Sequence, residues 1–206
     1  MQSIAVVAFF LAVLLSPLGA TPPGTNARET FRLKLVAAAV ERASHVVRYD
    51  PAYLSIPYPN GDVPAATGVC TDEVIRSYRA LGIDLQKEVH EDILRARSEY
   101  LLRGRPDSNI DHRRVPNLMV FFRRQHASLP ITNNAADYVP GDLVTWDLND
   151  GKGKRVDHIG IVIDRKPLWH DRYMILHNIG AGPKIEDVLF DWKITGHFRY
   201  YGPQAN

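Results

Sequence analysis

The residue best suited to covalent chemistry in this sequence is its single cysteine, Cys70. It stands in the segment GVCTDEVIRSYRALG, where Gly68 closes a loop and Thr71 and Asp72 are typical of the first turn of a helix. Free backbone N–H groups and the helix dipole stabilise a thiolate at such a position, and the same groups can donate to an oxyanion during acyl transfer. The position favours a nucleophile; the alternative is a small, buried, inert side chain.

A cysteine nucleophile needs a base within hydrogen-bond reach, and His158 is the candidate. It begins the run HIGIVID directly after a turn, so its side chain can point into a cleft at the mouth of a strand. Gly160 shares its face of that strand, and we expect this glycine to permit close approach of the cysteine helix. The three isoleucines of the run, Ile159, Ile161 and Ile163, then fill the opposite face.

A third polar group usually fixes the tautomer of the base. The next predicted strand contains His177 and Asn178, which are adjacent and therefore project to opposite faces. At most one of them can lie beside His158. We favour His177 for this role, and we expect Asn178 to form other hydrogen bonds or to pack.

Hydrophobic periodicity predicts helices in the first part of the chain and strands in the last part. The strand-like runs are rich in β-branched and aromatic residues and are separated by turn signals such as NDGKGK. Helices that precede a small antiparallel sheet form an α+β fold, unlike the alternating units of a parallel sheet. The predicted helices are residues 27–48, a helix that follows Gly68 and stops at Gly82, residues 85–102 and the short segment PNLMVFFRR; residues 49–64 form an extended loop; the predicted strands are residues 141–148, 158–164, 173–180 and 197–202.

These motifs occur in an order that resembles a known superfamily. A cysteine at a helix start, PGD before a strand, HIGIV and a polar residue in the next strand resemble the NlpC-type branch of the papain-like cysteine peptidases, which cleave peptide bonds in bacterial cell walls. More closely, GVCTDEVIRSYRALGIDLQ with DHRRVPNL, PGDLVTW, DHIGIV and HNIG resembles an exported bacterial family whose domain has no assigned function. The resemblance implies a papain-like domain over residues 47–203. It also implies that Cys70 is the nucleophile, that His158 is the base and that His177 is the third polar residue.

Further site residues are candidates only. The resemblance implies a tyrosine upstream of the nucleophile that helps bind the oxyanion; Tyr58 has suitable spacing, and Tyr53 competes with it. The cluster DHRR before a helix offers Asp111, Arg113 and Arg114, and guanidinium forks pair well with a substrate carboxylate. In the alternative interpretation, Asp111 pairs with an arginine or caps the helix.

The N-terminus has the pattern of a secretory signal. An apolar run of about twelve residues, from Ile4 to Leu15, is followed by Pro17 and by small residues ending at Ala20. This run is shorter than the roughly twenty residues that span a bilayer. We expect a signal peptide at residues 1–20, a linker and helix at residues 21–46, and a periplasmic mature protein without a stable membrane span. Retention of the segment as an N-terminal anchor is the alternative.

Net charge and motif spacing argue against nucleic-acid, metal and cofactor binding. The net charge is +2, and no stripe of Lys and Arg interleaved with aromatic residues marks a nucleic-acid surface. No CxxC or HExxH spacing predicts a metal site, so we expect neither metal nor cofactor. The sequence therefore favours an exported cysteine hydrolase of peptide or amide bonds, with peptidoglycan peptides as the preferred substrate. The alternatives are a non-catalytic envelope-binding module on the same fold and an acyltransferase that passes its thioester to an amine.

Overall fold

The structure is a computed structural model that describes residues 27–100, 102, 104–155 and 157–203. The predicted signal peptide, residues 1–20, lies outside these residues, as does the linker before residue 27. Within the described part of the chain, no helix is long and apolar enough to cross a membrane.

Four α-helices form where the sequence predicts them, although two are shorter than expected. The first helix ends at Arg42 rather than near residue 48. The third helix is capped at its N-terminus by Asp84, whose side chain accepts hydrogen bonds from two backbone amides of the first turn. It ends at Arg95 because Ala96 leaves helical geometry, with φ −138° and ψ 44°. The helices are α1 (Ala27–Arg42), α2 (Cys70–Arg79), α3 (Leu85–Arg95) and α4 (Val115–Arg124).

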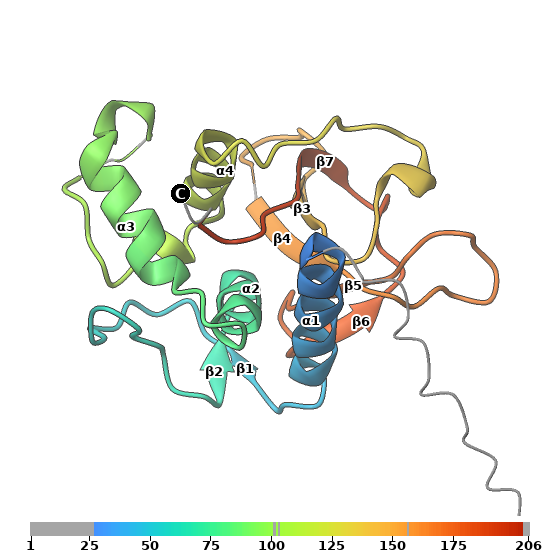
Figure 1. The fold of residues 1–206 in the computed structure, drawn as a ribbon, viewed down its shortest axis with the longest axis horizontal. Coiled ribbons are helices and arrows are strands. Elements are labelled where there is room, and N and C mark those ends of the chain that lie inside the picture. Colours follow the sequence, from blue (N-terminus) through green and yellow to red (C-terminus); the bar gives the residue numbers. More distant parts are fainter. Residues whose placement is uncertain (1–26, 101, 103, 156, 204–206) are drawn as a thin grey trace, which may run out of the picture.

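The last part of the chain forms a five-stranded antiparallel sheet, which confirms the predicted α+β fold of helices followed by a small antiparallel sheet (Figure 1). One short edge strand, β6, was not predicted, and the last strand begins before the predicted run at residues 197–202. In spatial order the strands are β6 (Lys184–Glu186), β5 (Ile175–His177), β4 (Asp157–Val162), β3 (Leu143–Asp147) and β7 (Lys193–Phe198).

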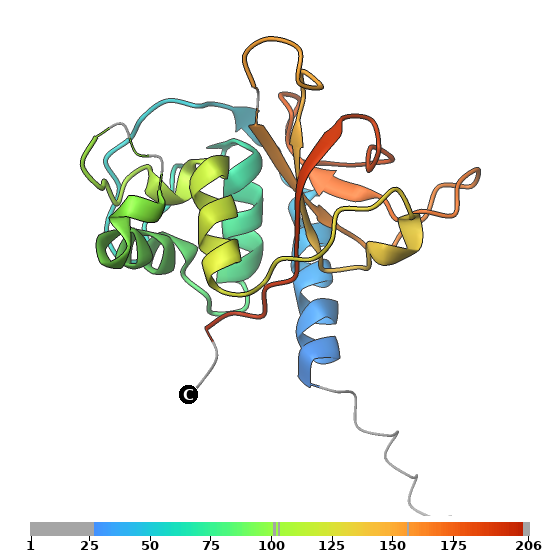
Figure 2. The ribbon, with the colours of Figure 1, turned by 90° about the horizontal axis from the view of Figure 1, so that it is seen from above.

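The sheet is covered on both faces. Helices α2, α3 and α4 lie together on one side of it in Figure 2. On that side Ile159, Ile161 and Ile163 of the β4 segment belong to the same buried cluster as Val74 and Ile75 of α2. Successive residues of a strand point to opposite faces of the sheet. A second buried cluster therefore forms on the other face, and it contains Val144, Trp146, Val162, Ile175 and Leu189.

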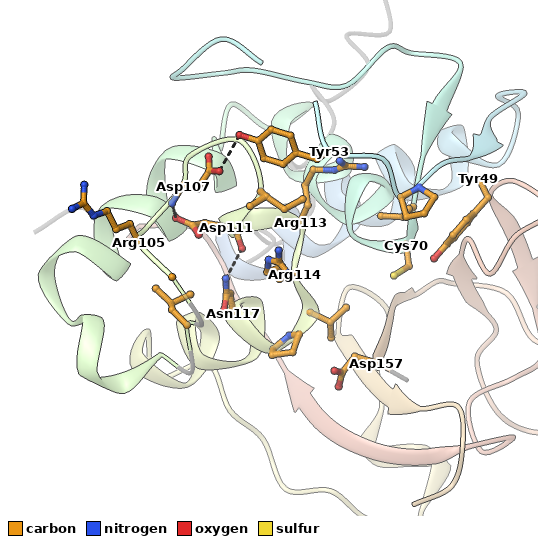
Figure 3. A pocket seen from close by; sticks show the side chains of 17 residues that line it. Tyr49, Tyr53, Cys70, Arg105, Asp107, Asp111, Arg113, Arg114, Asn117 and Asp157 are labelled. Atoms are coloured by element: carbon orange, nitrogen blue, oxygen red, sulfur yellow. Dashed lines mark hydrogen bonds between the residues drawn. The ribbon is translucent and has the colours of Figure 1, made fainter. Parts of the chain in front are cut away.

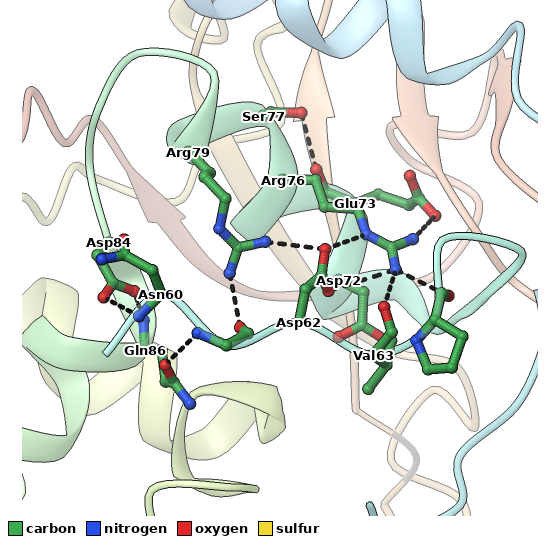
Figure 4. Close-up of polar contacts among 12 residues, drawn as sticks. Asn60, Asp62, Val63, Asp72, Glu73, Arg76, Ser77, Arg79, Asp84 and Gln86 are labelled. Carbon is green, nitrogen blue, oxygen red and sulfur yellow. Dashed lines mark hydrogen bonds and ion pairs between the residues drawn. The ribbon is translucent and has the colours of Figure 1, made fainter. Parts of the chain in front are cut away.

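Charged side chains on α2 hold the chain segment that precedes it (Figure 4). The guanidinium of Arg76 donates to the carboxylate of Asp62 (Nε–Oδ2, 3.0 Å) and to the carbonyl of Thr67 (2.9 Å). On the same helix, Glu73 accepts a hydrogen bond from Arg42 of α1 at 2.8 Å, and both side chains are almost fully buried. Buried charges of this kind require partners, so the helix and its leading loop adopt one arrangement.

Asp72 makes the central contacts of this network. One of its oxygens accepts from the backbone N–H of Val69 at 2.7 Å, which closes the first turn of α2. Its carboxylate also accepts two hydrogen bonds from Arg113, at 2.8 and 2.9 Å. The side chains of Asp72 and Arg113 are only 2% and 3% exposed. This one carboxylate therefore ties the start of α2 to the segment before α4.

Replacing Asp72 with alanine should strongly destabilise the fold, because it leaves the Arg113 guanidinium buried without a counter-charge. Breaking a buried pair in this way costs roughly 3–5 kcal/mol. Urea denaturation of the purified variant would measure the loss. Asp171→Ala is the matched control, since Asp171 pairs with Lys166 on the surface and is 92% exposed; it should leave the free energy of unfolding unchanged. Equal stability of the two variants would contradict the structural role of Asp72.

Candidate active site

Cys70 is the first residue of α2, and its side chain is buried with its sulfur against backbone amides. The backbone N–H groups of Thr71 and Cys70 at the helix start, and of Ile159 in strand β4, lie near the sulfur and act to lower the pKa of the thiol. Burial outweighs them: desolvation, with a smaller contribution from Asp72, raises the pKa of the thiol to about 12. The resting side chain is therefore a thiol at neutral pH, and the expected stable thiolate is not formed.

Tyr49 lies beside Cys70 (Figure 3). Strand β1 (Arg48–Tyr49) pairs in parallel with β2 (Thr67–Gly68), and this register sets Tyr49 opposite Gly68, two residues before Cys70. Burial, and then the neighbouring Cys70, raise the pKa of the tyrosine. The hydroxyl thus stays protonated and can donate a hydrogen bond. Sequence reasoning missed this residue because strands of two residues have no periodicity.

The two predicted histidines contact each other. The Nε2 atom of His158 lies 2.8 Å from Nδ1 of His177, and both side chains are almost completely buried. Desolvation, with a smaller effect of His177, lowers the pKa of His158 to about 3. Desolvation also lowers the pKa of His177. Both rings are therefore neutral at pH 7, and Trp146 and Trp192 pack around the His158 ring.

One expectation about strand β4 is wrong. His158 pairs across the ladder with Trp146 and shares its face of the sheet, whereas the isoleucines of the strand face the helices. Gly160 accordingly does not admit the cysteine helix. A Cβ atom there would lie 2.5 Å from Ile175 Cγ2 and 3.2 Å from His177 Cβ. The glycine makes room for side chains of β5, including the partner of His158.

Cys70 lies near the beginning of strand β4, where its sulfur is close to the backbone N–H of Ile159. His158 precedes that amide at the same end of the strand, but its ring projects to the face of the sheet opposite the helices. Among the described residues, no hydrogen bond joins the sulfur directly to the His158 ring. Hydrogen bonds between catalytic groups are often long before substrate binds.

His177, not Asn178, contacts the His158 ring. Asn178 is fully buried and accepts from the backbone N–H of Gly180 at 3.2 Å, and its side-chain nitrogen has no partner among the described residues. On its far side, His177 lies 2.9 Å from a carboxylate oxygen of Glu186 (Nε2–Oε2). Glu186 was not predicted, because the three-residue strand that carries it has no distinct pattern.

A cavity of about 710 Å³ opens beside Cys70. In Figure 3, Cys70 and Tyr49 lie at one end of it, and Asp107 and Arg105 lie at the other. Its volume lies within the range of about 300–1,000 Å³ that is typical of ligand-binding pockets. Further lining residues are Tyr53, Val69, Ile110, Asp111, Arg113, Arg114, Val115, Asn117 and Asp157.

The three candidates of the DHRR cluster all line this cavity, but they differ in whether their side chains already have hydrogen-bond partners. Asp111 is buried and accepts from His90 and from the backbone N–H of Asp107, both at 2.8 Å. Arg113 is bound to Asp72 and has little capacity left for a ligand. Arg114 is exposed, and within the described part of the chain its guanidinium has no hydrogen bond or ion pair. Of the predicted pair, only Arg114 is free to bind a substrate carboxylate.

Tyr58 does not lie with the other site residues. Its hydroxyl donates to Glu91 at 3.4 Å and its ring packs against His90, away from the residues that line the cavity. Tyr53 does line the cavity, but its hydroxyl donates to Asp107. Spacing along the loop therefore did not predict which tyrosine lies beside Cys70, because the pairing of β1 with β2 brings Tyr49 there.

Comparison of the sequence with known proteins assigns the chain to a family. Residues 36–200 match the family described as Domain of unknown function (DUF1287). The chain belongs to this family. A curated relative, Uncharacterized protein YijF of Escherichia coli (strain K12), is 43% identical over 200 residues, which cover 95% of this chain and 94% of the relative. The DUF1287 region includes every residue of the site described above.

Two solved structures are similar to this DUF1287 protein at low levels. NlpC1 from Trichomonas vaginalis is 15% identical with a TM-score of 0.44, and NlpC2 from the same organism is 14% identical with a TM-score of 0.45. The matches cover 87% and 82% of this chain, but the chain spans only 46% of the length of either structure. Any assignment of chemistry to the DUF1287 chain rests on its own residues.

The buried state of Cys70 predicts an unusual alkylation profile. Because burial raises the thiol pKa to about 12, the rate of reaction of the folded protein with iodoacetamide should rise steadily from pH 7 to pH 10. Only the thiolate reacts, so no plateau should occur in this range. The same protein in urea is the control, since its single thiol should level off near an ordinary pKa of about 8.5. Mass spectrometry follows both rates, and a plateau in the folded protein below pH 8 would contradict the argument from burial.

Proposed function

We propose that this chain is an exported cysteine hydrolase that cleaves peptide or amide bonds, with Cys70 as nucleophile and His158 as base. The observation that carries the proposal is the position of Cys70. Cys70 lies at the start of a buried helix with three backbone N–H groups near its sulfur, and it lines a cavity of about 710 Å³. The neighbouring strand presents a neutral, oriented histidine pair at the same end.

The reaction begins from neutral groups. As the sulfur attacks the substrate carbonyl, the thiol proton passes to the His158 ring, and a carbon–sulfur bond forms. The carbon–nitrogen bond then breaks, and the amine leaves with the proton from His158. Water attacks the resulting thioester, gives one proton to His158 and releases the acid, and that proton returns to the Cys70 sulfur. No cofactor is required for this sequence of steps.

The charge that develops on the carbonyl oxygen needs donors aimed at it. The backbone N–H groups at the start of α2 supply one set, and Tyr49 supplies a protonated hydroxyl from the other side of the cysteine. Tyr49 thus takes the role for which Tyr58 was a candidate. Its raised pKa keeps the proton in place throughout the neutral range.

Replacing Cys70 with alanine should abolish cleavage while leaving the fold intact, because the side chain supplies the nucleophile and little core volume. Purified wild-type protein and variant would be incubated with defined cell-wall peptides, and the products identified by mass spectrometry. Circular dichroism checks the fold of the variant. Undiminished cleavage by the variant would end the proposal.

The same assay separates the two rival functions. Binding to wall material without thiol-dependent cleavage by either protein would favour the non-catalytic envelope-binding module. Wild-type products that carry an added amine, in place of a free carboxyl group, would favour the acyltransferase. Fractionation of cells for the periplasm would test the proposed export in parallel.

The cavity also favours a substrate that carries a carboxylate. Arg114 lines the cavity together with Cys70, and among the described residues its guanidinium has no ion-pair partner, while its neighbour Arg113 is paired with Asp72. A charge-assisted hydrogen bond of about 1.5–3 kcal/mol is typical of such a contact. Peptides of the bacterial wall carry free carboxylates, which is consistent with the preferred substrate.

Arg114→Ala should lower kcat/KM about tenfold for a carboxylate-bearing peptide, a loss of about 1.4 kcal/mol of binding. It should leave cleavage of the same peptide with that carboxylate amidated unchanged. Arg123→Ala is the matched control, because Arg123 is an exposed residue of α4 that does not line the cavity. Equal losses on both peptides would show that Arg114 does not read the carboxylate.

A further inference from the structure

Strand β6 at the edge of the sheet brings one carboxylate to the histidine pair. Glu186 pairs with Ile175, and His177 lies two residues further along β5 on the same face, so the two side chains are diagonal neighbours. The His177 ring is 1% exposed, whereas the Glu186 side chain is 40% exposed. The carboxylate therefore contacts a buried ring from a position that water can reach.

This contact determines where the protons lie. An ionised carboxylate only accepts, so the Nε2 atom of His177 must carry hydrogen and donate to Glu186. A neutral ring has one N–H, which leaves Nδ1 of His177 as an acceptor. The Nε2 atom of His158, 2.8 Å away, must then be the donor.

From this chain of hydrogen bonds we propose that Glu186 is a positioning residue that sets the tautomers of both rings and leaves Nδ1 of His158 unprotonated as the basic atom. The proposal rests on the proposed function for its catalytic meaning, but the tautomer itself can be measured without any substrate. Nδ1 is the ring nitrogen nearer the backbone, and the backbone N–H of the next residue, Ile159, reaches the Cys70 sulfur.

The alternative proton arrangement would disable the base. If His177 were protonated on both nitrogens, it would donate to His158, and the single hydrogen of His158 would move to Nδ1. Burial opposes this state by lowering the pKa of His177, while Glu186 and Asp191 favour it. The gain of one proton by His177 would therefore convert the active pair into an inactive one.

Nitrogen-15 NMR of the imidazole rings measures this position directly. In the wild-type protein, His158 should show a protonated Nε2 and an unprotonated Nδ1. Glu186→Ala should give a mixture of tautomers, because nothing then requires a donor at His177 Nε2. Glu186→Gln should keep the wild-type tautomer, since the amide oxygen can still accept. Glu41→Gln is the control, because Glu41 contacts His45 in an exposed pair on α1.

Kinetics on a cleaved peptide supply the second readout. Glu186→Ala should lower kcat about 10- to 100-fold with little change in KM, the range found when the partner that orients a metal-bound histidine is removed, and Glu186→Gln should restore most of the rate. A wild-type His158 protonated on Nδ1, or a tautomer unchanged in Glu186→Ala, would overturn the proposal. If no thiol-dependent cleavage is found in any variant, the proposed function fails, while the NMR result still decides the role of Glu186.

Discussion

The bidentate ion pair between Asp72 and Arg113 is the constraint on which the site depends. Asp72 closes the first turn of α2 by accepting from Val69, and the same carboxylate binds the segment that forms the wall of the cavity. The start of the helix, its cysteine and the cavity wall therefore cannot move independently. A buried pair of this kind contributes little net stability compared with apolar packing, but it specifies one geometry.

Burial has a second consequence, which concerns reactivity. The environment that fixes Cys70 and His158 also removes them from water, which raises the pKa of the thiol and lowers that of the imidazole. Both side chains are therefore uncharged at neutral pH, so they do not form a thiolate–imidazolium ion pair. Under the proposed function, an exported protein meets oxidising conditions, and a buried thiol would be protected there because oxidation acts mainly on exposed thiolates.

Much of this architecture could be predicted from the sequence, and the errors have physical causes. Hydrophobic spacing located α2 and β4 because each buries a continuous apolar face. Alternation along β4 showed which residues share a face, but it could not show which face meets the helix, so Gly160 was assigned to the wrong contact. Tyr49 and Glu186 reach the site only through strand pairings of two or three residues, which leave no pattern in a single sequence.

The adjacent arginines illustrate how the fold divides residues that are alike in sequence. Arg114 precedes α4 with an extended backbone, φ −106° and ψ 116°, so neighbouring side chains point in opposite directions. Arg113 consequently enters the interior and binds Asp72, while Arg114 remains in the cavity. The candidate site also combines two parts of the fold: Cys70 and most of the cavity come from the helical part, whereas Asp157 and the two histidines come from the sheet. Packing of the β4 isoleucines against α2 aligns the two parts, so neither part holds a complete site alone.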